Sequence, residues 1–338
     1  MIKVPAQDQP EHERRGPAAS PARLEAVRRL TSDLQAQIDE VARAARAVDG
    51  GVTPFGEHKW LRLIRGDDRC AALVLWQGAA VVGAAHCDTY HTRAPNRPCR
   101  LTAELVVHPS YRGHGLGTRL VQGMSDLAHE EGADEMHLWA YGNLPTARRL
   151  AERMGYASER VLLQLLLPAE RLPAPPDVPA PGSGSVRLRA FEPGQDADPW
   201  LQLHNRVFAG HPEQGQWDAS DVQARLEQPW FDPQDLLLAE ETGSGRLLGF
   251  CWVKLPRDET LPGEIYIIGV DPDERGRGLG QLLTQAGLAR IAARGRPSAM
   301  LFVEADNAAA VALYAKLGFA RQWEHACYAR PAASDSIG

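Results

Sequence analysis

The sequence predicts a mixed α/β protein made of two similar domains in tandem. The chain has 338 residues, a length that suits about two domains of ordinary size. A Gly-rich string occurs twice in register, and strand-like and helix-like segments follow each other in the same order in both halves. A single long repeat at one fixed offset indicates a duplicated domain rather than a solenoid.

The first half is expected over residues 21–167, after a polar segment 1–20 that lacks an apolar signal-peptide core and is predicted to be disordered. Apolar residues near a helical period predict a helix over 21–48, which ends at Gly50-Gly51. Strands are then expected over 70–76, 79–86 and 101–107, a helix over 115–131, a strand over 135–139, a helix over 143–154 and a strand over 161–167.

The second half is expected over residues 186–330, after a Pro-rich linker at 168–185 and before a short tail at 331–338. Its segments repeat the order of the first half. Strands are predicted over 186–190, 235–240, 247–254, 264–270, 299–304 and 326–329, and helices over 199–208, 220–227, 279–293 and 307–317.

Composition excludes several classes of protein. The net charge of −6 argues against binding to nucleic acid, and no apolar run is long enough to predict a membrane span. The five cysteines include no C-x-x-C pair, so reduced thiols in a cytoplasmic protein are expected. We also expect no metal, because the cluster of His and Cys between His86 and Cys99 fits no common ligand spacing.

The repeated string runs from Val107 to Gly117 in the first half and from Val270 to Gly280 in the second. Each copy joins a predicted strand to a predicted helix, and its glycines let successive backbone N–H groups converge on an anion at the helix N-terminus. This arrangement suits a diphosphate. A dinucleotide fingerprint is excluded because Thr118 and Gln281 stand where its last Gly would be, and neither copy has the Lys of a P-loop.

The pattern Arg-x-x-Gly-x-Gly between a strand and a helix resembles the acetyl-CoA pyrophosphate motif of the GNAT acetyltransferase superfamily. The resemblance covers both halves and implies two tandem acetyltransferase domains, each a twisted, mostly antiparallel sheet flanked by helices, with acetyl-CoA as co-substrate. It implies cofactor contacts at Leu105, Val106, Val107, Arg112, Gly113, His114, Gly115, Leu116 and Gly117 in the first copy, and at Ile268, Gly269, Val270, Arg275, Gly276, Arg277, Gly278, Leu279, Gly280, Gln281 and Asn307 in the second.

The second half is also similar to the mycothiol synthase family, tandem GNAT enzymes of actinomycetes. The similarity rests on the strings HPEQG at 211–215, WFDP at 230–233 and GEIYIIGVDP at 263–272, and in the first half on GVTPFGE at 51–57. It implies transfer of acetyl from acetyl-CoA to the cysteinyl amine of a Cys-glucosamine-inositol pseudodisaccharide, giving mycothiol and CoA.

Two side chains are the expected catalytic groups. Glu264 would take a proton from the attacking amine, directly or through a water, because an α-amino group with a pKa of about 8 needs only a modest base. A backbone N–H within 268–270 would hold the thioester oxygen, and Gly269 suits a bulge or a close approach of ligand. Tyr314 resembles the family's general acid; because full transfer to a thiolate is uphill by about 2 kcal/mol, hydrogen bonding alone is equally plausible.

Substrate contacts implied by the resemblance are Glu57, Glu213, Lys254 and Glu264. Carboxylates suit the ammonium of the substrate, and Lys254 suits sugar hydroxyls or the cysteinyl carbonyl. Phe302 is a departure from the pattern, since a Tyr is expected at this substrate-binding position and its hydroxyl would be missing here.

The first half is expected to be non-catalytic. Leu101 aligns with Glu264 and Ala151 aligns with Tyr314, so both the base and the acid are absent. Glu104 aligns with Ile267 and, at an odd offset along a strand, would point to the other face unless a bulge intervenes. This half either binds acetyl-CoA or is vestigial.

Two other functions remain open at this point. One is a tandem GNAT enzyme that acetylates another small amine, such as an aminoglycoside, or a protein N-terminus. The other is a non-catalytic regulator that binds acyl-CoA. Because the duplication already supplies a domain pair, we expect a monomer.

Overall fold

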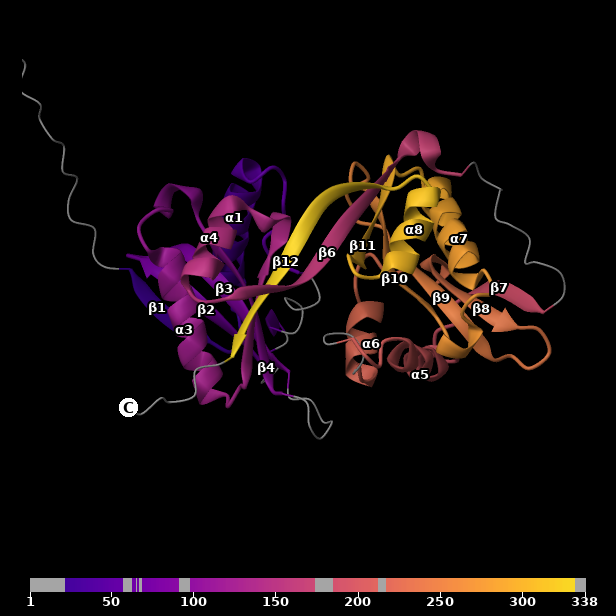
Figure 1. Ribbon diagram of the computed structural model, residues 1–338, viewed down its shortest axis with the longest axis horizontal. Helices are drawn as coiled ribbons and strands as arrows, with labels where there is room; N and C mark the ends of the chain where they lie inside the picture. Colours follow the sequence, from indigo (N-terminus) through magenta and orange to yellow (C-terminus); the bar gives the residue numbers. More distant parts are fainter. Residues whose placement is uncertain are drawn as a thin grey trace, which may run out of the picture. The chain divides into compact units, whose positions relative to one another are not determined.

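The structure is a computed structural model that describes residues 22–56, 63–64, 66, 69–90, 98–173, 185–211 and 217–331. Contacts divide the chain into two compact units. Unit 1 comprises residues 1–88 and 103–130, and unit 2 comprises residues 89–102 and 131–338. Most predicted elements are present in the described part of the chain (Figure 1).

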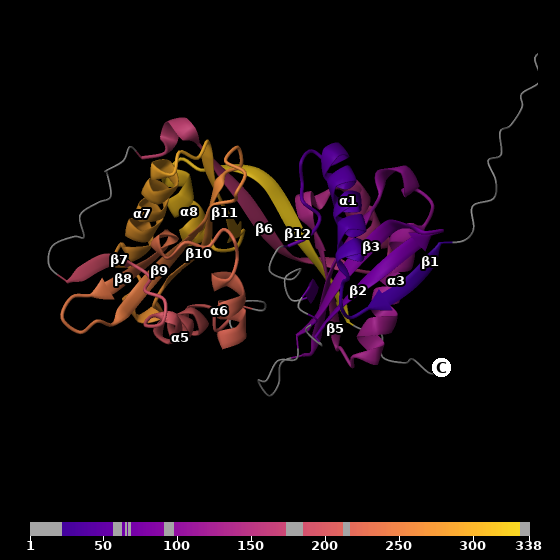
Figure 2. The same ribbon diagram turned by 180° about the vertical axis from the view of Figure 1, so that it is seen from behind.

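Unit 1 contains a sheet in the order β1-β2-β3-β4 with two helices. Side chains of α1 pack with Ala72 and Val74 of β2, whereas Gly123 of α3 lies against Leu73, so the two helices cover opposite faces (Figure 2). The elements are β1 (Arg23–Val27), α1 (Ser32–Val48), β2 (Cys70–Gln77), β3 (Ala80–Tyr90), β4 (Arg100–Val107), which begins in unit 2, and α3 (Leu116–Glu130).

The predicted helix over 21–48 is wrong in its first part. Residues Arg23–Val27 form strand β1, which pairs antiparallel with β2, and the helix begins only after Thr31. Thr31 is the N-cap, and its hydroxyl accepts a hydrogen bond from the N–H of Leu34 at 3.2 Å. The spacing of Leu24 and Val27 fits a helix by chance. A segment of five residues is too short to distinguish the helical period of 3.6 residues from the strand period of two.

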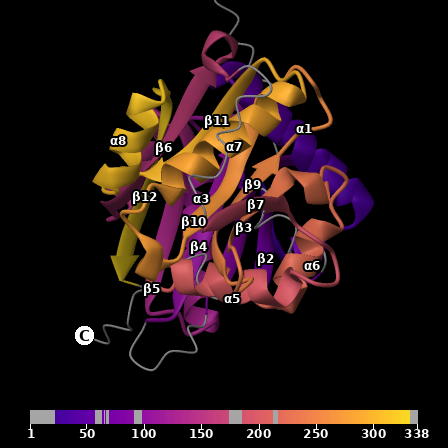
Figure 3. The same ribbon diagram turned by 90° about the vertical axis from the view of Figure 1, so that its right-hand side faces the viewer.

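Unit 2 contains a sheet in the order β5-β12-β6-β11-β10-β9-β8-β7. Buried side chains on one face pack with α7 and α8, and those on the other face pack with α5 and α6 (Figure 3). The elements are β5 (Glu135–Ala140), α4 (Pro145–Arg153), β6 (Ala157–Pro168), β7 (Val186–Ala190), α5 (Ala197–Val207), α6 (Ala219–Leu226), β8 (Leu236–Glu241), β9 (Leu247–Lys254), β10 (Gly263–Val270), α7 (Leu279–Ala293), β11 (Ser298–Glu304), α8 (Ala308–Lys316) and β12 (Ala320–Pro331).

The last strand of each sequence repeat pairs with strands of the other repeat. Strand β6 pairs antiparallel with β11 and β12, and β12 pairs antiparallel with β5 and β6, so the two long strands run side by side (Figure 1). Both are longer than predicted. The compact units therefore differ from the sequence repeats, and the domain boundaries at 167 and 186 stay a prediction.

Candidate active site

The two Gly-rich turns have the same backbone geometry. Each follows a strand, passes through one 3₁₀ turn and enters a helix, α3 in the first copy and α7 in the second. The first two glycines are left-handed in both copies, with φ of 82° and 78° at Gly113 and Gly115 and of 80° and 79° at Gly276 and Gly278. A Cβ added at any of the four would meet no atom within 4 Å, so the conformation, not crowding, demands glycine.

The two turns share their backbone geometry, but the side chains of the arginines that open them, Arg112 and Arg275, have different partners. Arg112 forms a bidentate ion pair with Asp49 at the end of α1, with both N–O distances 2.7 Å, and its Nε donates to the Val107 carbonyl at 3.1 Å. Arg275 holds the matching position in unit 2 and has no carboxylate partner within the described ranges. The guanidinium of Arg112 is therefore engaged by a carboxylate of the protein itself.

Strands β10 and β11 separate next to the second Gly-rich turn. Their parallel ladder joins Gly263–Ile265 to Ala299–Leu301 and, over the described residues, extends no further, although both strands continue. Beyond that point β11 pairs with β6 and β10 with β9. At this opening, the described residues of β11 make no ladder with Ile268, Gly269 and Val270, which pair with β9 alone.

A β-bulge at Tyr266 interrupts the alternation of side chains between the two faces of β10. Ile265 pairs with Val253 and Ile267 with Trp252, so Tyr266 is an extra residue in the ladder. As a result Ile265 packs with the core under α7 and α8, whereas Tyr266 and Ile267 pack with the aromatic core under α5 and α6. Of the two alternatives for Gly269, the bulge is wrong, because Gly269 pairs regularly with Phe250, and the close approach of ligand stays a prediction. A Cβ at Gly269 would come within 2.8 Å of Val207.

The bulge also bears on the face of the strand to which the position of Glu104 belongs. In the second repeat, Ile267 aligns with Glu104 and lies on the aromatic face together with Tyr266. Because of the bulge, its offset of three residues from Glu264 does not place it on the other face of the sheet. In unit 1, however, Glu104 is only 1% exposed and its carboxylate accepts a hydrogen bond from the Gly56 N–H at 2.7 Å. Glu104 is held by the loop that precedes Glu57, which lies outside the described residues, as does Glu213.

Glu264 and Lys254 face each other across β10 and β9. Their strands pair these two residues directly, and Lys254 Nζ lies 3.8 Å from Glu264 Oε2. The side chains are 15% and 14% exposed, so the ion pair is close to solvent but sheltered. A glutamate can accept a proton only as the carboxylate, the form that a nearby ammonium such as that of Lys254 favours.

Aromatic rings form the wall beside this ion pair. Lys254 Nζ lies 5.4 Å from the ring centre of Trp230 and 5.6 Å from that of Tyr266, distances at which a cation is attracted to a ring face. The Tyr266 hydroxyl accepts from Arg225 Nε at 3.2 Å, and the Arg225 guanidinium stacks on Trp217. Sequence reasoning missed these contacts, because only the bulge turns Tyr266 toward Trp230.

Phe302 lies on β11 at a position that shares this face. Met300 pairs with Glu264, and Phe302 is two residues further along the strand. Its ring is 38% exposed and lies 5.6 Å from the ring of His325, centre to centre. His325 accepts from the Gly142 N–H at Nδ1 and contacts Gln164 Oε1 at Nε2, 3.2 Å away. Burial lowers the pKa of His325 to about 4, so the ring is neutral.

Tyr314 lies on α8 in the core on the opposite face of the sheet. It is 6% exposed, and its ring packs edge-on against Phe319 with the centres 5.8 Å apart. Burial raises the pKa of Tyr314, with a smaller contribution from Cys251. Complete proton transfer to a thiolate is therefore more uphill than the sequence alone suggests, and a hydrogen bond to the leaving sulfur is favoured.

Helix α8 begins at Asn307, one of the expected cofactor contacts. The Asn307 side-chain oxygen caps the helix by accepting from the Ala310 N–H at 3.2 Å. Its amide N–H₂ is not used by this cap. Ile268, Val270 and Tyr314 belong to one core cluster on this side of the sheet, so the structure brings these three predicted residues together.

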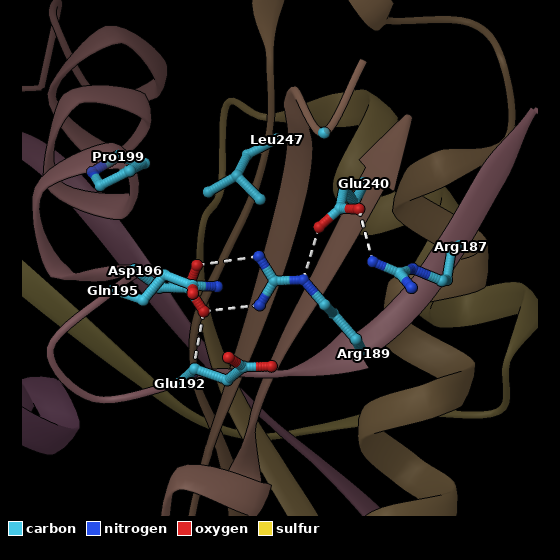
Figure 4. Close-up of a pocket in the computed structure, with 9 residues that line it drawn as sticks. Arg187, Arg189, Glu192, Gln195, Asp196, Pro199, Glu240 and Leu247 are labelled. Atoms are coloured by element: carbon cyan, nitrogen blue, oxygen red, sulfur yellow. Dashed lines mark hydrogen bonds and ion pairs between the residues drawn. The ribbon is translucent and has the colours of Figure 1, made fainter. Parts of the chain in front are cut away.

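A separate pocket at the β7–β8 edge is lined by an ion-pair network, not by predicted site residues (Figure 4). Arg189 bonds both oxygens of Asp196, at 2.5 and 2.8 Å, and its Nε bonds Glu240 at 2.5 Å. Burial raises the pKa of Asp196, but hydrogen bonds from Arg189 and the Glu192 N–H outweigh it, and the net pKa is lowered. The Arg189 hydrogen bond likewise lowers the pKa of Glu240.

We expect Arg189→Met to destabilise unit 2 by about 3 kcal/mol at neutral pH, because two sheltered carboxylates lose the guanidinium that they share. Glu240 then keeps Arg187, and Asp196 keeps only the Glu192 N–H. Both carboxyl pKa values are depressed in the folded protein, so the pair's contribution is present above about pH 4 and is lost as the pH falls through the folded-state values. Urea unfolding at pH 7 and at acid pH measures the difference, which must shrink on acidification. An equal loss at both pH values would show that packing, not charge, is responsible.

Comparison with known proteins places these features in a family. The acetyltransferase (GNAT) family model matches residues 37–156 and 198–319. A mycothiol acetyltransferase of Thermobispora bispora is 42% identical over 310 residues, covering 90% of this chain and 98% of that protein. One from Salinispora arenicola is also 42% identical, over 316 residues, covering 91% of this chain and 97% of its own.

Solved structures show the same fold. A tandem GNAT protein from the clavulanic acid biosynthesis pathway has a TM-score of 0.70 at 19% identity and covers 93% of this chain and 100% of its own. A GCN5-related N-acetyltransferase from Sphaerobacter thermophilus has a TM-score of 0.68 at 24% identity, covering 92% and 96%. Across the described residues, every helix is too short or too polar to span a bilayer.

Proposed function

The chain belongs to the acetyltransferase (GNAT) family, and we propose that it is the enzyme that completes mycothiol by acetylating a cysteinyl pseudodisaccharide. The predicted duplication, the two-domain fold and the acetyl-transferring activity are confirmed. The proposal adds the acceptor, Cys-GlcN-Ins, and the donor, acetyl-CoA. Its main structural support is the Glu264–Lys254 pair beside the opening between β10 and β11.

In the proposed reaction Glu264 takes the proton of the attacking cysteinyl ammonium, directly or through a water. The amine nitrogen then forms a bond to the thioester carbon, and a backbone N–H within 268–270 stabilises the oxyanion. The C–S bond breaks as the intermediate collapses, and Tyr314 hydrogen-bonds the departing CoA sulfur. The second proton lost by the attacking nitrogen passes through solvent to that thiolate. The raised pKa of Tyr314 supports this role over full proton donation.

Lys254 has two tasks in this proposal. Its ammonium keeps the Glu264 side chain in place, and it lies beside the rings of Trp230 and Tyr266, where it would donate to a cysteinyl carbonyl or a sugar hydroxyl of the bound substrate. Phe302 contributes an apolar surface on the same face, where a Tyr would add a hydroxyl. Glu57 and Glu213 complete the proposed substrate contacts by resemblance alone.

The first repeat is proposed to support the enzyme without catalysing. Its Gly-rich turn keeps the backbone shape of an acetyl-CoA cradle, but its Arg112 is bound to Asp49 and it has Leu101 and Ala151 at the base and acid positions. Either bound acetyl-CoA or a vestigial site is compatible with this arrangement. The enzyme is further proposed to act in the cytoplasm as a monomer, with no nucleic acid or membrane partner.

Mass spectrometry of a reaction containing acetyl-CoA and the cysteinyl pseudodisaccharide tests the acceptor. We expect one acetyl group on the cysteinyl amine and stoichiometric release of CoA. CoA release with other amines only, such as aminoglycosides or peptide N-termini, would replace this acceptor with another. Absence of turnover with every amine would support an acyl-CoA-binding regulator.

The two Gly-rich turns offer a matched pair of variants. Gly276→Ala places a methyl group in a left-handed residue and should raise the KM for acetyl-CoA about tenfold, since the strain is roughly 1–2 kcal/mol and the methyl obstructs the diphosphate. Gly113→Ala carries the same strain and should lower stability equally while leaving that KM unchanged. Steady-state kinetics and thermal melts separate the two effects; an equal rise in KM for both variants would contradict the assignment.

A further inference from the structure

We propose that His137, Glu159 and Cys327 form a zinc-binding site separate from the acetyl-transfer site. The three residues lie on β5, β6 and β12 of unit 2, and their ligand atoms all lie within 4.8 Å of one another. No metal was expected from the sequence, on the basis of the cluster between His86 and Cys99 alone. His137, Glu159 and Cys327 are far apart along the chain, so no local ligand spacing indicates them.

Strand register explains how the three side chains meet. Cys327 pairs with Trp139 on β5 and with Arg160 on β6, and directly paired residues share a face. His137 is two residues from Trp139 and therefore lies on that face as well. The register shift between Cys327 and Tyr328 makes Glu159 an extra residue in β6, and such a bulge can turn its carboxylate to the same face.

The distances between ligand atoms fit a tetrahedral zinc ion. Zinc bonds of about 2.0–2.3 Å at a tetrahedral angle place neighbouring ligand atoms roughly 3.3–3.7 Å apart. Cys327 Sγ lies 3.6 Å from His137 Nδ1, and Glu159 Oε2 lies 3.1 Å from the same nitrogen. Cys327 Sγ and the ligand oxygen of Glu159 lie within 4.8 Å of each other, so a movement of the carboxylate would complete this geometry.

The other ring nitrogen of His137 has the support typical of a zinc ligand. His137 Nε2 lies 3.3 Å from Glu135 Oε2, and Glu135 is itself anchored by Arg100 Nε at 2.8 Å. When Nε2–H donates to this carboxylate, the lone pair of Nδ1 is left to bind a metal. The chain thus supplies a carboxylate–histidine pair in which the histidine points at a thiol and a second carboxylate.

Charge and ligand type select the metal. On binding, the Cys327 thiol releases its proton to solvent as the S–Zn bond forms, and the thiolate and the Glu159 carboxylate balance the two positive charges. Sulfur and imidazole ligands favour zinc over magnesium or calcium. His137 and Cys327 are 3% and 0% exposed, whereas the Glu159 side chain is 39% exposed, so a water can occupy the fourth position.

Such an ion would join strands of both repeats, because β5 and β6 come from the first and β12 from the second. It would therefore stabilise the sheet of unit 2 where the last strands are exchanged. No step of acetyl transfer depends on it, and the proposal is independent of the acceptor substrate.

Metal content of the full chain, purified without a polyhistidine tag, tests the site. We expect close to one zinc per chain by mass spectrometry of the metal, and after chelation we expect zinc to raise the melting temperature. Cobalt added to the metal-free protein should give a thiolate-to-cobalt charge-transfer band and the intense visible bands of tetrahedral coordination.

Variants assign the ligands. Cys327→Ala should abolish zinc uptake and the charge-transfer band, and Glu159→Gln should weaken affinity about 10–100-fold. Cys70→Ala, which removes another buried thiol in unit 1, should retain both. Wild-type protein that takes up no zinc in a competition titration, or that shows no cobalt–thiolate band, would overturn the site whether or not Cys327→Ala folds.

Discussion

Glu264→Gln is expected to lower kcat by roughly 10²–10⁴, the range for removal of a general base. The amide has nearly the size of the carboxylate and still accepts hydrogen bonds, but it cannot take the proton of the attacking ammonium. The KM for acetyl-CoA should change little, because the cradle lies at the other end of β10. Steady-state release of CoA with the cysteinyl acceptor measures both constants.

A control variant and a pH dependence test whether the loss of kcat in Glu264→Gln comes from loss of the general base. Glu25→Gln, on strand β1 of unit 1, applies the same chemical change outside the proposed site and should leave turnover intact. Raising the pH deprotonates the acceptor amine in solution, so the deficit of Glu264→Gln should narrow above about pH 8. Wild-type turnover by both Glu264→Gln and Tyr314→Phe would contradict catalysis by the second repeat.

Ala326→Pro is expected to destabilise unit 2 by at least about 3 kcal/mol. Ala326 is 1% exposed in the middle of β12, where it pairs with Ala140 of β5 and Val161 of β6. Proline has no N–H for the ladder and its ring does not fit between two neighbouring strands. Urea unfolding followed by far-ultraviolet circular dichroism measures the loss.

Ala219→Pro is the matched control in the same unit. Ala219 is the first residue of α6, it is exposed, and the preceding Asp218 has the extended backbone that a following proline requires. This variant should keep wild-type stability within about 0.5 kcal/mol. If both variants unfolded at the same urea concentration as the wild type, β12 would not be an interior strand.

Local sequence signals predicted most of the fold. The positions of α7 and α8 and of strands β9 to β11 follow from apolar periods bounded by Gly and Pro, and these signals need no knowledge of distant partners. The exchange of β6 and β12 could not be predicted in this way. Both strands have apolar residues that suit either repeat, and only pairing across the whole chain decides which neighbour each one joins.

In the candidate site, too, the local motifs could be predicted from the sequence and the contacts set by strand register could not. Glu264 and Lys254 lie on adjacent predicted strands, and the Gly-rich turn is a contiguous motif, so the sequence indicates each of them. The bulge at Tyr266 is a property of the register between two strands and leaves no mark in the sequence. For this reason the aromatic wall of Trp230 and Tyr266 was missed, as was the meeting of His137 with Cys327.

The position of β12 has a consequence for synthesis of the chain. Ribosomes make β12 after β5 and β6, and until its 12 residues emerge, these two strands lack the partner that lies between them in the finished sheet. Open strand edges are sites of aggregation. In the nascent protein, β5 and β6 of the first repeat therefore stay without this partner until β12 has been made, and a premature stop before β12 would leave the earlier repeat incomplete as well as the later one.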